Sequence, residues 1–505
     1  MPIFRGLLKE KSTKGKKKPK QDKRTAEKLD RELPYVITLI TIMAASGVSP
    51  FGSFMKLARY KLLPRVMKEA RNIVGQVHIL GEDPLTAMEK RANNASSKQY
   101  RDLLLGYVST VRNGGDIASF LQSKMKSIFE YEVSIARQSV AKIGGLVDAY
   151  MIMQVIALSM YVVVVAISTG SQSSVMPSSM SSPVFSYLLV FVLLPAISLL
   201  ILFVLDKTVS SSLVGARDVL LKGICFSMAA IVAFAVLAVS GILQHVLDPV
   251  YAFPIFMIAA SVWPAYRAMQ SEKNMKGMES ELPSYLRDVA ESRKAGLSPE
   301  KSIIYASERI RDSTFNKVVK AFSNQLEWGV PLRKIYDNLA ATVKSWSALI
   351  HFRILVEAIE SGGGYTTSLE ILAQSSESYY NIEMEKKSML KPYFFIAFMV
   401  TALTSFTTLM VAETFVQVGE ITSDDGTGAS SSPQSGVAGE VLSSTQMFAI
   451  GISAQSWMTG FLIGKISTGT FATGFRYAII LVAISMFAAL ITQEFNLSPS
   501  ILISS

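Results

Sequence analysis

Seven long apolar runs constrain the fold of this chain more than any other feature of its sequence. They lie at 147–168, 184–205, 223–243, 248–266, 392–414, 445–464 and 476–493. A helix needs about 20 predominantly apolar residues to cross a bilayer, and the mean hydropathy of +0.34 is too high for an ordinary soluble protein. We therefore predict an all-α, polytopic membrane protein with about seven transmembrane helices. The run 445–464 is the weakest candidate, because polar residues interrupt it.

Lys and Arg are missing from every second connection between these runs. The loops 169–183, 244–247 and 415–444 contain neither residue, and nor does the C-terminal segment 494–505. Cytoplasmic flanks of transmembrane helices collect Lys and Arg. We therefore expect a cell-membrane protein whose two basic segments, before the first run and between the fourth and fifth, are cytoplasmic. The C-terminus is expected outside.

These two basic segments contain the same motifs in the same order. Each motif returns at an offset between 247 and 249: Glu32-Leu33-Pro34 as Glu281-Leu282-Pro283, Gly47-Val48-Ser49-Pro50 as Gly296-Leu297-Ser298-Pro299, and Asn113-Gly114-Gly115 with Leu121 as Ser361-Gly362-Gly363 with Leu369. Chance similarity would not keep the offset constant. We predict two copies of one domain.

The shared motifs are those that begin and end helices. A serine followed by proline, as at Ser49-Pro50 and Ser298-Pro299, supplies an N-cap hydroxyl and a first helical residue that needs no N–H. Apolar residues three and four apart precede each pair, which predicts one buried helix face. Each copy is therefore predicted to be a helical bundle. The structural motif residues are Pro34, Gly47, Pro50, Gly114 and Gly115 in the first copy and Pro283, Gly296, Pro299, Gly362 and Gly363 in the second.

These patterns divide the chain into five predicted parts. They are a basic disordered tail (1–31), the first cytoplasmic domain (32–146), four transmembrane helices (147–266), the second cytoplasmic domain (267–391), and three transmembrane helices with an acidic, Ser- and Gly-rich outer loop at 415–444 (392–505). The tail has nine basic residues between Lys9 and Arg24. It either contacts anionic lipid or is a solvated topology signal. We expect no nucleic-acid binding, because no recognisable nucleic-acid-binding module follows it.

Residue patterns typical of an active site are missing. The Gly464-Lys465 pair is followed by Ile466 where a phosphate-binding loop needs Ser or Thr. The three histidines have no metal-ligand spacing, and the single cysteine, Cys225, allows no disulfide within the chain. We predict a protein that is not an enzyme and needs no cofactor, so that its energy must come from a partner.

The Glu-Leu-Pro, Gly-x-Ser-Pro and Gly-Gly-x-x-x-x-x-Leu motifs, found twice around membrane helices, resemble the type II secretion system F domain family. The number of spans is similar to that of the archaeal form, including the archaellum platform. The resemblance implies an assembly platform that binds a hexameric secretion ATPase in the cytoplasm and pilin or archaellin subunits in the bilayer. A homodimer is also expected. Near the glycine motif the family has an acidic Gly-Glu pair, of which only Glu360 in the second copy is present.

One surface is a candidate for contact with the ATPase. It comprises the basic residues Arg287, Arg293, Lys294, Arg309 and Arg311 of the second copy. A solvated face would have the same composition. The alternative function is a secondary transporter or another polytopic membrane protein with cytoplasmic helical domains. A transporter would place its repeats inside the membrane and carry charges near the midplane.

Overall fold

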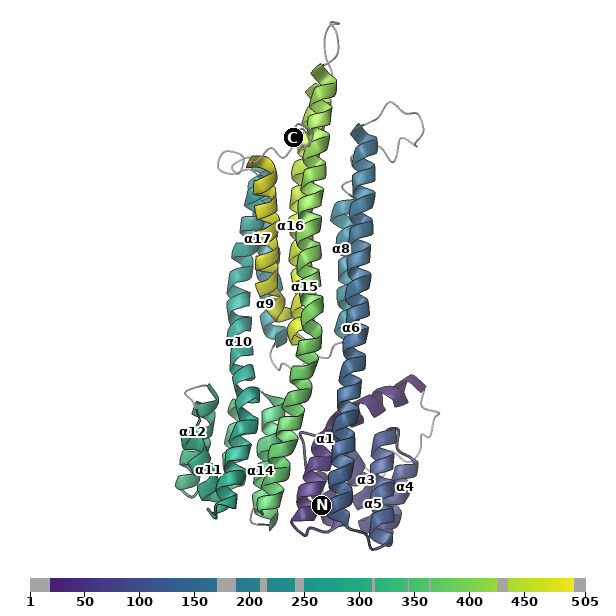
Figure 1. Cartoon of the computed structure of the whole chain (residues 1–505), viewed down its shortest axis with the longest axis vertical. Coiled ribbons are helices and arrows are strands. Elements are labelled where there is room, and N and C mark those ends of the chain that lie inside the picture. Colours follow the sequence, from purple (N-terminus) through teal and green to yellow (C-terminus); the bar gives the residue numbers. More distant parts are fainter. Residues whose placement is uncertain are drawn as a thin grey trace, which may run out of the picture. The chain divides into compact units, whose positions relative to one another are not determined.

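A computed structural model describes residues 19–169, 188–208, 216–240, 249–310, 314–343, 345–362, 365–424 and 435–494. Within these ranges the secondary structure consists of helices and turns (Figure 1), which confirms the all-α prediction. The chain forms two compact units. Unit 1 combines Met1–Ile135 with Asn274–Glu383, and unit 2 combines Ala136–Lys273 with Met384–Ser505. Both predicted cytoplasmic copies thus contribute to unit 1.

Unit 1 contains helices from both copies in the same order. The first copy supplies α1 (Pro19–Ala45), α2 (Pro50–Leu57), α3 (Pro64–Leu80), α4 (Pro84–Asn93), α5 (Lys98–Arg112) and the start of α6 (Ile117–Thr169). The second supplies the end of α10 (Pro249–Lys294), α11 (Pro299–Glu308), α12 (Thr314–Glu327), α13 (Leu332–Thr342), α14 (Trp346–Gly362) and the start of α15 (Thr366–Asp424). Helices α2 and α11 begin 249 residues apart, as do α6 and α15.

The predicted helix starts are confirmed at both Ser-Pro pairs. The Ser49 hydroxyl accepts the Gly52 N–H at 3.2 Å, and the Ser298 hydroxyl accepts the Lys301 N–H at 3.3 Å. The preceding helices end at Ala45 and Lys294, and two residues later Gly47 and Gly296 have left-handed φ angles of 76° and 93°. A side chain at either position would be strained, which explains why both copies have glycine here.

The predicted apolar helix faces are also confirmed. These are Leu33, Val36, Ile37 and Ile40 on α1 and Leu282, Tyr285, Leu286 and Val289 on α10, all buried in the core of unit 1. Beside Leu33, the buried Glu32 carboxylate accepts the N–H groups of Arg65 at 3.1 Å and Val66 at 2.9 Å. An anion at a helix N-terminus satisfies unpaired donors and the helix dipole. Glu32 therefore fixes the start of α3 against α1.

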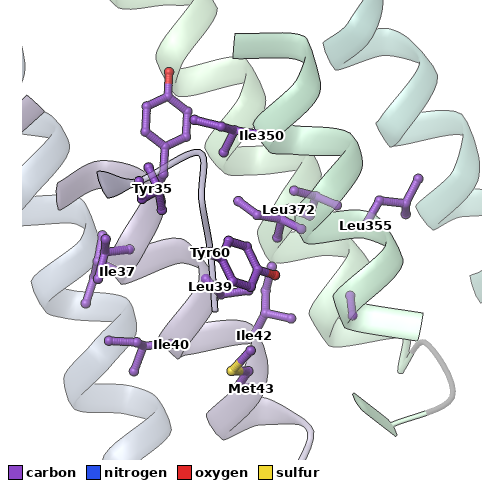
Figure 2. Packing of buried hydrophobic residues seen from close by; sticks show 14 of the residues in the cluster. Tyr35, Ile37, Leu39, Ile40, Ile42, Met43, Tyr60, Ile350, Leu355 and Leu372 are labelled. Atoms are coloured by element: carbon purple, nitrogen blue, oxygen red, sulfur yellow. The ribbon is translucent and has the colours of Figure 1, made fainter. Parts of the chain in front are cut away.

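The two copies meet along α1, which packs against α14 and α15 (Figure 2). Tyr35, Leu39 and Ile42 of α1 belong to the same buried cluster as Ile350 of α14 and Leu372 of α15. We call this contact the seam. Because its residues are buried, unit 1 has one hydrophobic core shared by both copies.

Unit 2 contains the apolar helices. Besides parts of α6, α10 and α15, it consists of the π-helical segment η1 (Leu189–Leu193), α8 (Leu194–Thr208), α9 (Ala216–Val239), α16 (Ser435–Thr468), the 3₁₀ turn η3 (Phe471–Thr473) and α17 (Gly474–Glu494). Five candidate spans occur among the described residues: Ile117–Ile156, Phe191–Thr208, Val219–Leu237, Thr366–Thr407 and Phe471–Ile491. The predicted runs 248–266 and 445–464 lie in α10 and α16 but are not among the five. The count of seven stays a prediction.

Helices α16 and α17 approach each other closely because small residues line their contact. A Cβ atom on Gly460 would lie 2.4 Å from the Ala478 backbone, and one on Gly464 would lie 2.3 Å from that of Gly474. The Ser453 and Ser485 hydroxyls are 3.4 Å apart across the same contact. The small residues of α16 therefore serve packing within the chain.

Two predicted irregular segments are partly helical. Helix α1 begins at Pro19, so residues 19–31 are not disordered. They are rich in good helix formers, and Leu29 is buried in the core. Residues 1–18 lie outside the described part. The predicted outer loop 415–444 is shorter, because α15 reaches Asp424 and α16 begins at Ser435. Helix-breaking Gly, Ser and Pro are concentrated in 426–433, within the stretch 425–434 that is not described.

Candidate functional site

The candidate basic surface begins on the last turns of α10. Arg287, Glu291 and Lys294 are spaced four and three residues apart, which places them on one helix face. They line an open groove between α10 and α15, together with Ala290 from α10 and Glu370, Ala373, Gln374 and Glu377 from α15. The groove therefore combines the predicted cations with carboxylates from a helix about 80 residues away in the sequence.

Each of the two central cations has a carboxylate partner on α15. Arg287 forms an ion pair with Glu377, and the Lys294 Nζ lies 2.7 Å from the Glu370 Oε1. The hydrogen bond to Glu370 raises the pKa of Lys294, and that to Glu377 raises the pKa of Arg287. Both cations stay charged, but the neighbouring carboxylates largely cancel their electrostatic fields at the groove. This groove is a mixed-charge surface rather than a positive patch.

The other predicted basic residues lie in different surroundings. The Arg293 Nη1 donates to the Leu297 carbonyl oxygen at 2.7 Å, beyond the end of α10. The Arg309 guanidinium lies 5.8 Å from the centre of the Tyr305 ring. Arg311 and Gly363 lie outside the described residues. The structure thus brings Arg287 and Lys294 onto one groove, and it gives Arg293 and Arg309 separate local contacts.

The groove lies on the helix face that corresponds to the seam face of α1. Where α1 buries Tyr35 and Ile42, α10 at the offset of 249 exposes Ser284 and Glu291. The partner helix has changed as well. Trp346 and Ile350 of α14 correspond, at an offset of 248, to Lys98 and Asp102 of α5. The first copy has the apolar seam residues on α1 but not on α5, and the second copy has them on α14 but not on α10. The seam therefore forms once, and the equivalent faces of α5 and α10 are polar.

A buried ionic cluster closes one end of the seam. The Glu357 carboxylate on α14 is 2% exposed, and the Lys56 Nζ of the first copy lies 2.7 Å from its Oε1. The Tyr60 hydroxyl donates to Glu357 at 3.3 Å, and the Arg353 Nη2 lies 3.7 Å away. Burial, followed by the Glu357 charge, raises the pKa of the Tyr60 phenol well above its usual value. Lys56 and Tyr60 therefore join the copies through a carboxylate that water does not reach.

Sequence reasoning missed this cluster because the duplication does not repeat it. At the offsets of 249 and 248, Lys56 corresponds to Tyr305 and Glu357 to Ser109. The signal that could have found it is a position where one copy has a charge and the other has an uncharged residue.

Unit 2 contains a polar cluster that sequence reasoning also missed. The Gln455 Nε2 on α16 donates to the Tyr150 hydroxyl of α6 at 3.0 Å and to the Ser198 hydroxyl of α8 at 2.8 Å. The Thr459 hydroxyl lies 2.7 Å from the Tyr150 hydroxyl. These bonds hold three apolar helices in register. Two helical turns beyond Thr459, buried Lys465 pairs with Asp206 at 2.7 Å.

The structure shows whether metal-ligating groups occur in the described part of the chain and where the Gly464-Lys465 pair and His351 lie. No group of three or more His, Cys, Asp or Glu side chains there could hold a metal ion. The Gly464-Lys465 pair lies inside α16, where Lys465 is 2% exposed and bonded to Asp206. His351 is fully buried, and its Nδ1 donates to the Ser347 carbonyl oxygen at 2.8 Å. His351 is thus a core residue.

Comparison with known proteins identifies part of the chain. Residues 285–412, which run from the end of α10 through α11–α14 into α15, match the type II secretion system (T2SS), protein F family. An uncharacterized protein of Methanocaldococcus jannaschii is 22% identical over 399 residues. These cover 74% of this chain and 66% of the relative, just under two thirds of its length. No solved structure matches. The first copy lies outside the matched range, so its identity as a second F domain stays a prediction.

Proposed function

We propose that this protein is the membrane assembly platform of an archaeal type IV pilus-like filament. It couples a cytoplasmic secretion ATPase to the insertion of pilin or archaellin subunits. The observation that carries the proposal is the extent of the match to the F domain family, which begins in unit 1 and ends at residue 412, within the apolar run 392–414. The domain therefore combines a water-soluble bundle with a membrane helix, as a platform between an ATPase and a membrane-embedded subunit requires.

The proposed mechanism uses helices shared by both units. Helices α6, α10 and α15 contribute residues to unit 1 and unit 2 without a break. The platform hydrolyses no nucleotide itself. Movement of unit 1 by the ATPase passes along these helices to unit 2, where it displaces filament subunits from the bilayer. The transporter alternative has no supporting observation, because the repeated helices lie in unit 1.

The proposal also includes the orientation of the chain in the membrane. Unit 1 is cytoplasmic because its loops and helices carry many Lys and Arg, whereas the segments 169–183, 244–247 and 494–505 carry none. Unit 2 spans the cell membrane, and the C-terminus lies outside. In this arrangement the ATPase and its nucleotide meet unit 1 in the same compartment.

Deletion of the gene in its host tests this function. Cells without the protein should lose one class of surface filament, counted by electron microscopy, and should retain the filament subunits in the membrane. A plasmid copy of the wild-type chain should restore the filaments. Normal filament numbers in the deletion strain would contradict the proposal. Genes for a motor accessory complex beside this gene would favour the archaellum over an adhesive pilus.

A further inference from the structure

Chain order places three turns of each copy at the same end of unit 1. Helices joined by three or four residues and packed on each other run antiparallel. This holds for α1–α2 through 46–49 and α3–α4 through 81–83, which are in contact. It also holds for α5–α6 through 113–116, where Phe120 packs against Gly106. The starts of α3 and α5 lie beside Glu32 and Asp30 of α1, because Glu32 accepts the Val66 N–H and the Ser97 hydroxyl donates to Asp30. Both starts are far from the end of α1 at Ala45, so all three turns lie at the end where α6 begins. We call this end, with the equivalent turns of the second copy, the turn end.

Large apolar side chains are exposed at the turn end. Trp328 is 86% exposed, Ile79 and Leu80 are 58% and 57% exposed, and Tyr365 is 54% exposed. No other large hydrophobic residue in the described part of unit 1 is more than half exposed. Ile79 and Leu80 end α3, Trp328 directly follows α12, and Tyr365 directly precedes α15. Exposed aromatic and aliphatic residues that gather at one end of a water-soluble bundle indicate an interaction site.

Two of these side chains occupy equivalent positions in the two copies. Leu80 directly precedes Gly81, and Trp328, at an offset of 248, directly precedes Gly329. Both glycines have left-handed φ angles, 65° and 74°. The two copies thus present an apolar side chain at the same place on the same turn, although the residue itself differs.

The turn end is remote from the apolar runs along the chain. Helix α6 begins there at Ile117 and leaves unit 1 after Ile135, and α15 begins near Tyr365 and leaves after Glu383. Their apolar runs, 147–168 and 392–414, follow later in the sequence, after each helix has left unit 1. These side chains therefore fit a soluble protein as their partner rather than a lipid surface.

We propose that the turn end is the docking surface for a soluble protein built of identical subunits, each with one apolar pocket. Trp328 enters the pocket of one subunit, and Ile79 with Leu80 enters the equivalent pocket of another. Equivalent anchors on the two copies match equivalent pockets on a symmetric oligomer. Trp and Tyr are enriched among interface residues that dominate binding energy, whereas Arg287 and Lys294 already have carboxylate partners. The inference rests on the proposed function, in which this oligomer is the secretion ATPase.

Binding of the purified full-length chain, in detergent, to its purified cognate secretion ATPase tests the surface. We expect Trp328→Ala and the double variant Ile79→Ala/Leu80→Ala each to raise Kd at least tenfold, and their combination to abolish detectable binding. Tyr131→Ala is the matched control, because Tyr131 is an exposed aromatic residue on α6 away from the turns. It should change Kd less than threefold. The thermal unfolding midpoint of every variant should match the wild type, since the altered side chains are exposed.

The outcomes separate the two proposals. If the wild-type chain binds the ATPase and the turn-end variants bind equally well, the docking surface is wrong and the proposed function stands. If the wild-type chain fails to bind the ATPase with or without nucleotide, both are wrong. A turn-end variant that changes only self-association, measured by light scattering, would assign the surface to a second copy of this chain. One that changes only binding to vesicles of anionic lipid would assign it to the membrane. Either result would overturn this inference.

Discussion

The ion pair between Lys56 and Glu357 joins two side chains of very different exposure. Glu357 is 2% exposed, whereas Lys56 is 33% exposed and can reach water. A buried charge that loses its partner keeps its desolvation cost, but an exposed one is rehydrated. Removal of the lysine should therefore harm unit 1 more than removal of the carboxylate charge, although both changes break the same pair.

We predict that Lys56→Met lowers the free energy of unfolding by about 2 kcal/mol and that Glu357→Gln lowers it by about 1 kcal/mol. Chemical unfolding of the full chain in detergent would measure both values. The double variant should cost less than the sum of the single changes, because the two residues are in contact. Equal costs for the single variants, or strict additivity, would show that the buried carboxylate does not depend on Lys56.

His351 makes the stability of unit 1 depend on pH. Burial lowers its pKa from 6.5 to about 4. Between pH 4 and pH 6.5, therefore, His351 binds a proton in the unfolded chain but not in the folded chain. Stability is fully present above pH 6.5 and is lost as the pH falls towards 4, by up to about 3 kcal/mol.

The variant His351→Gln should remove this dependence, because its amide can still donate to the Ser347 carbonyl oxygen but does not titrate in this range. Thermal unfolding from pH 7 to pH 4 should show a smaller loss in the variant than in the wild type. The carboxyls of half-buried Asp30 and buried Glu32, whose pKa values burial raises, contribute with the opposite sign in both proteins. Only the difference between the two curves therefore reports on His351, and parallel curves would exclude its contribution.

At the scale of helices, features that depend only on neighbouring residues could be predicted from the sequence. The caps at Ser49 and Ser298 are local, so their motifs identify them without a structure. The apolar face of α10 followed for the same reason, from residues spaced three and four apart.

Features that depend on distant residues could not be predicted in this way. Arg287 and Lys294 formed a basic cluster in the sequence, but their partners Glu377 and Glu370 lie on another helix. To predict the seam, one would have to compare equivalent positions in the two copies and also know which helices are in contact. The helical conformation of residues 19–31 was missed because their charge outweighed Leu29, which the core of unit 1 buries.

The contact between α16 and α17 yields a prediction at the same scale. Replacement of Gly460 by Ala would place a methyl group 2.4 Å from the Ala478 backbone, so the helices must separate. We expect a loss of about 1–3 kcal/mol, the usual cost of overpacking, seen as a lower melting temperature in detergent. Gly145→Ala on α6 is the control, because no atom outside its own helix segment lies within 4 Å of the added carbon. It should be neutral or stabilising, and equal melting temperatures for the two variants would contradict close packing at Gly460.

For the whole molecule, the shared core of unit 1 limits how the chain crosses the membrane. Residues of both copies lie in one hydrophobic cluster, so both copies must be on the same side of the bilayer. The chain must therefore cross the membrane an even number of times between Ile135 and Asn274. The candidate spans in α6, α8 and α9 are three, which is odd. We therefore predict that the apolar run 248–266 is the fourth crossing, although it is not among the five candidates found in the described residues.

Cysteine labelling tests this parity. In a Cys225→Ser background, a membrane-impermeant maleimide should label Gln244→Cys in intact cells, because the segment before α10 is expected outside. Lys98→Cys of the first copy and Lys294→Cys of the second should react only after the cells are permeabilised. If α10 did not cross, the two copies would lie on opposite sides, and one of these cysteines would be labelled from outside. They could then not share the core that buries Ile42 and Ile350, and unit 1 could not form as described.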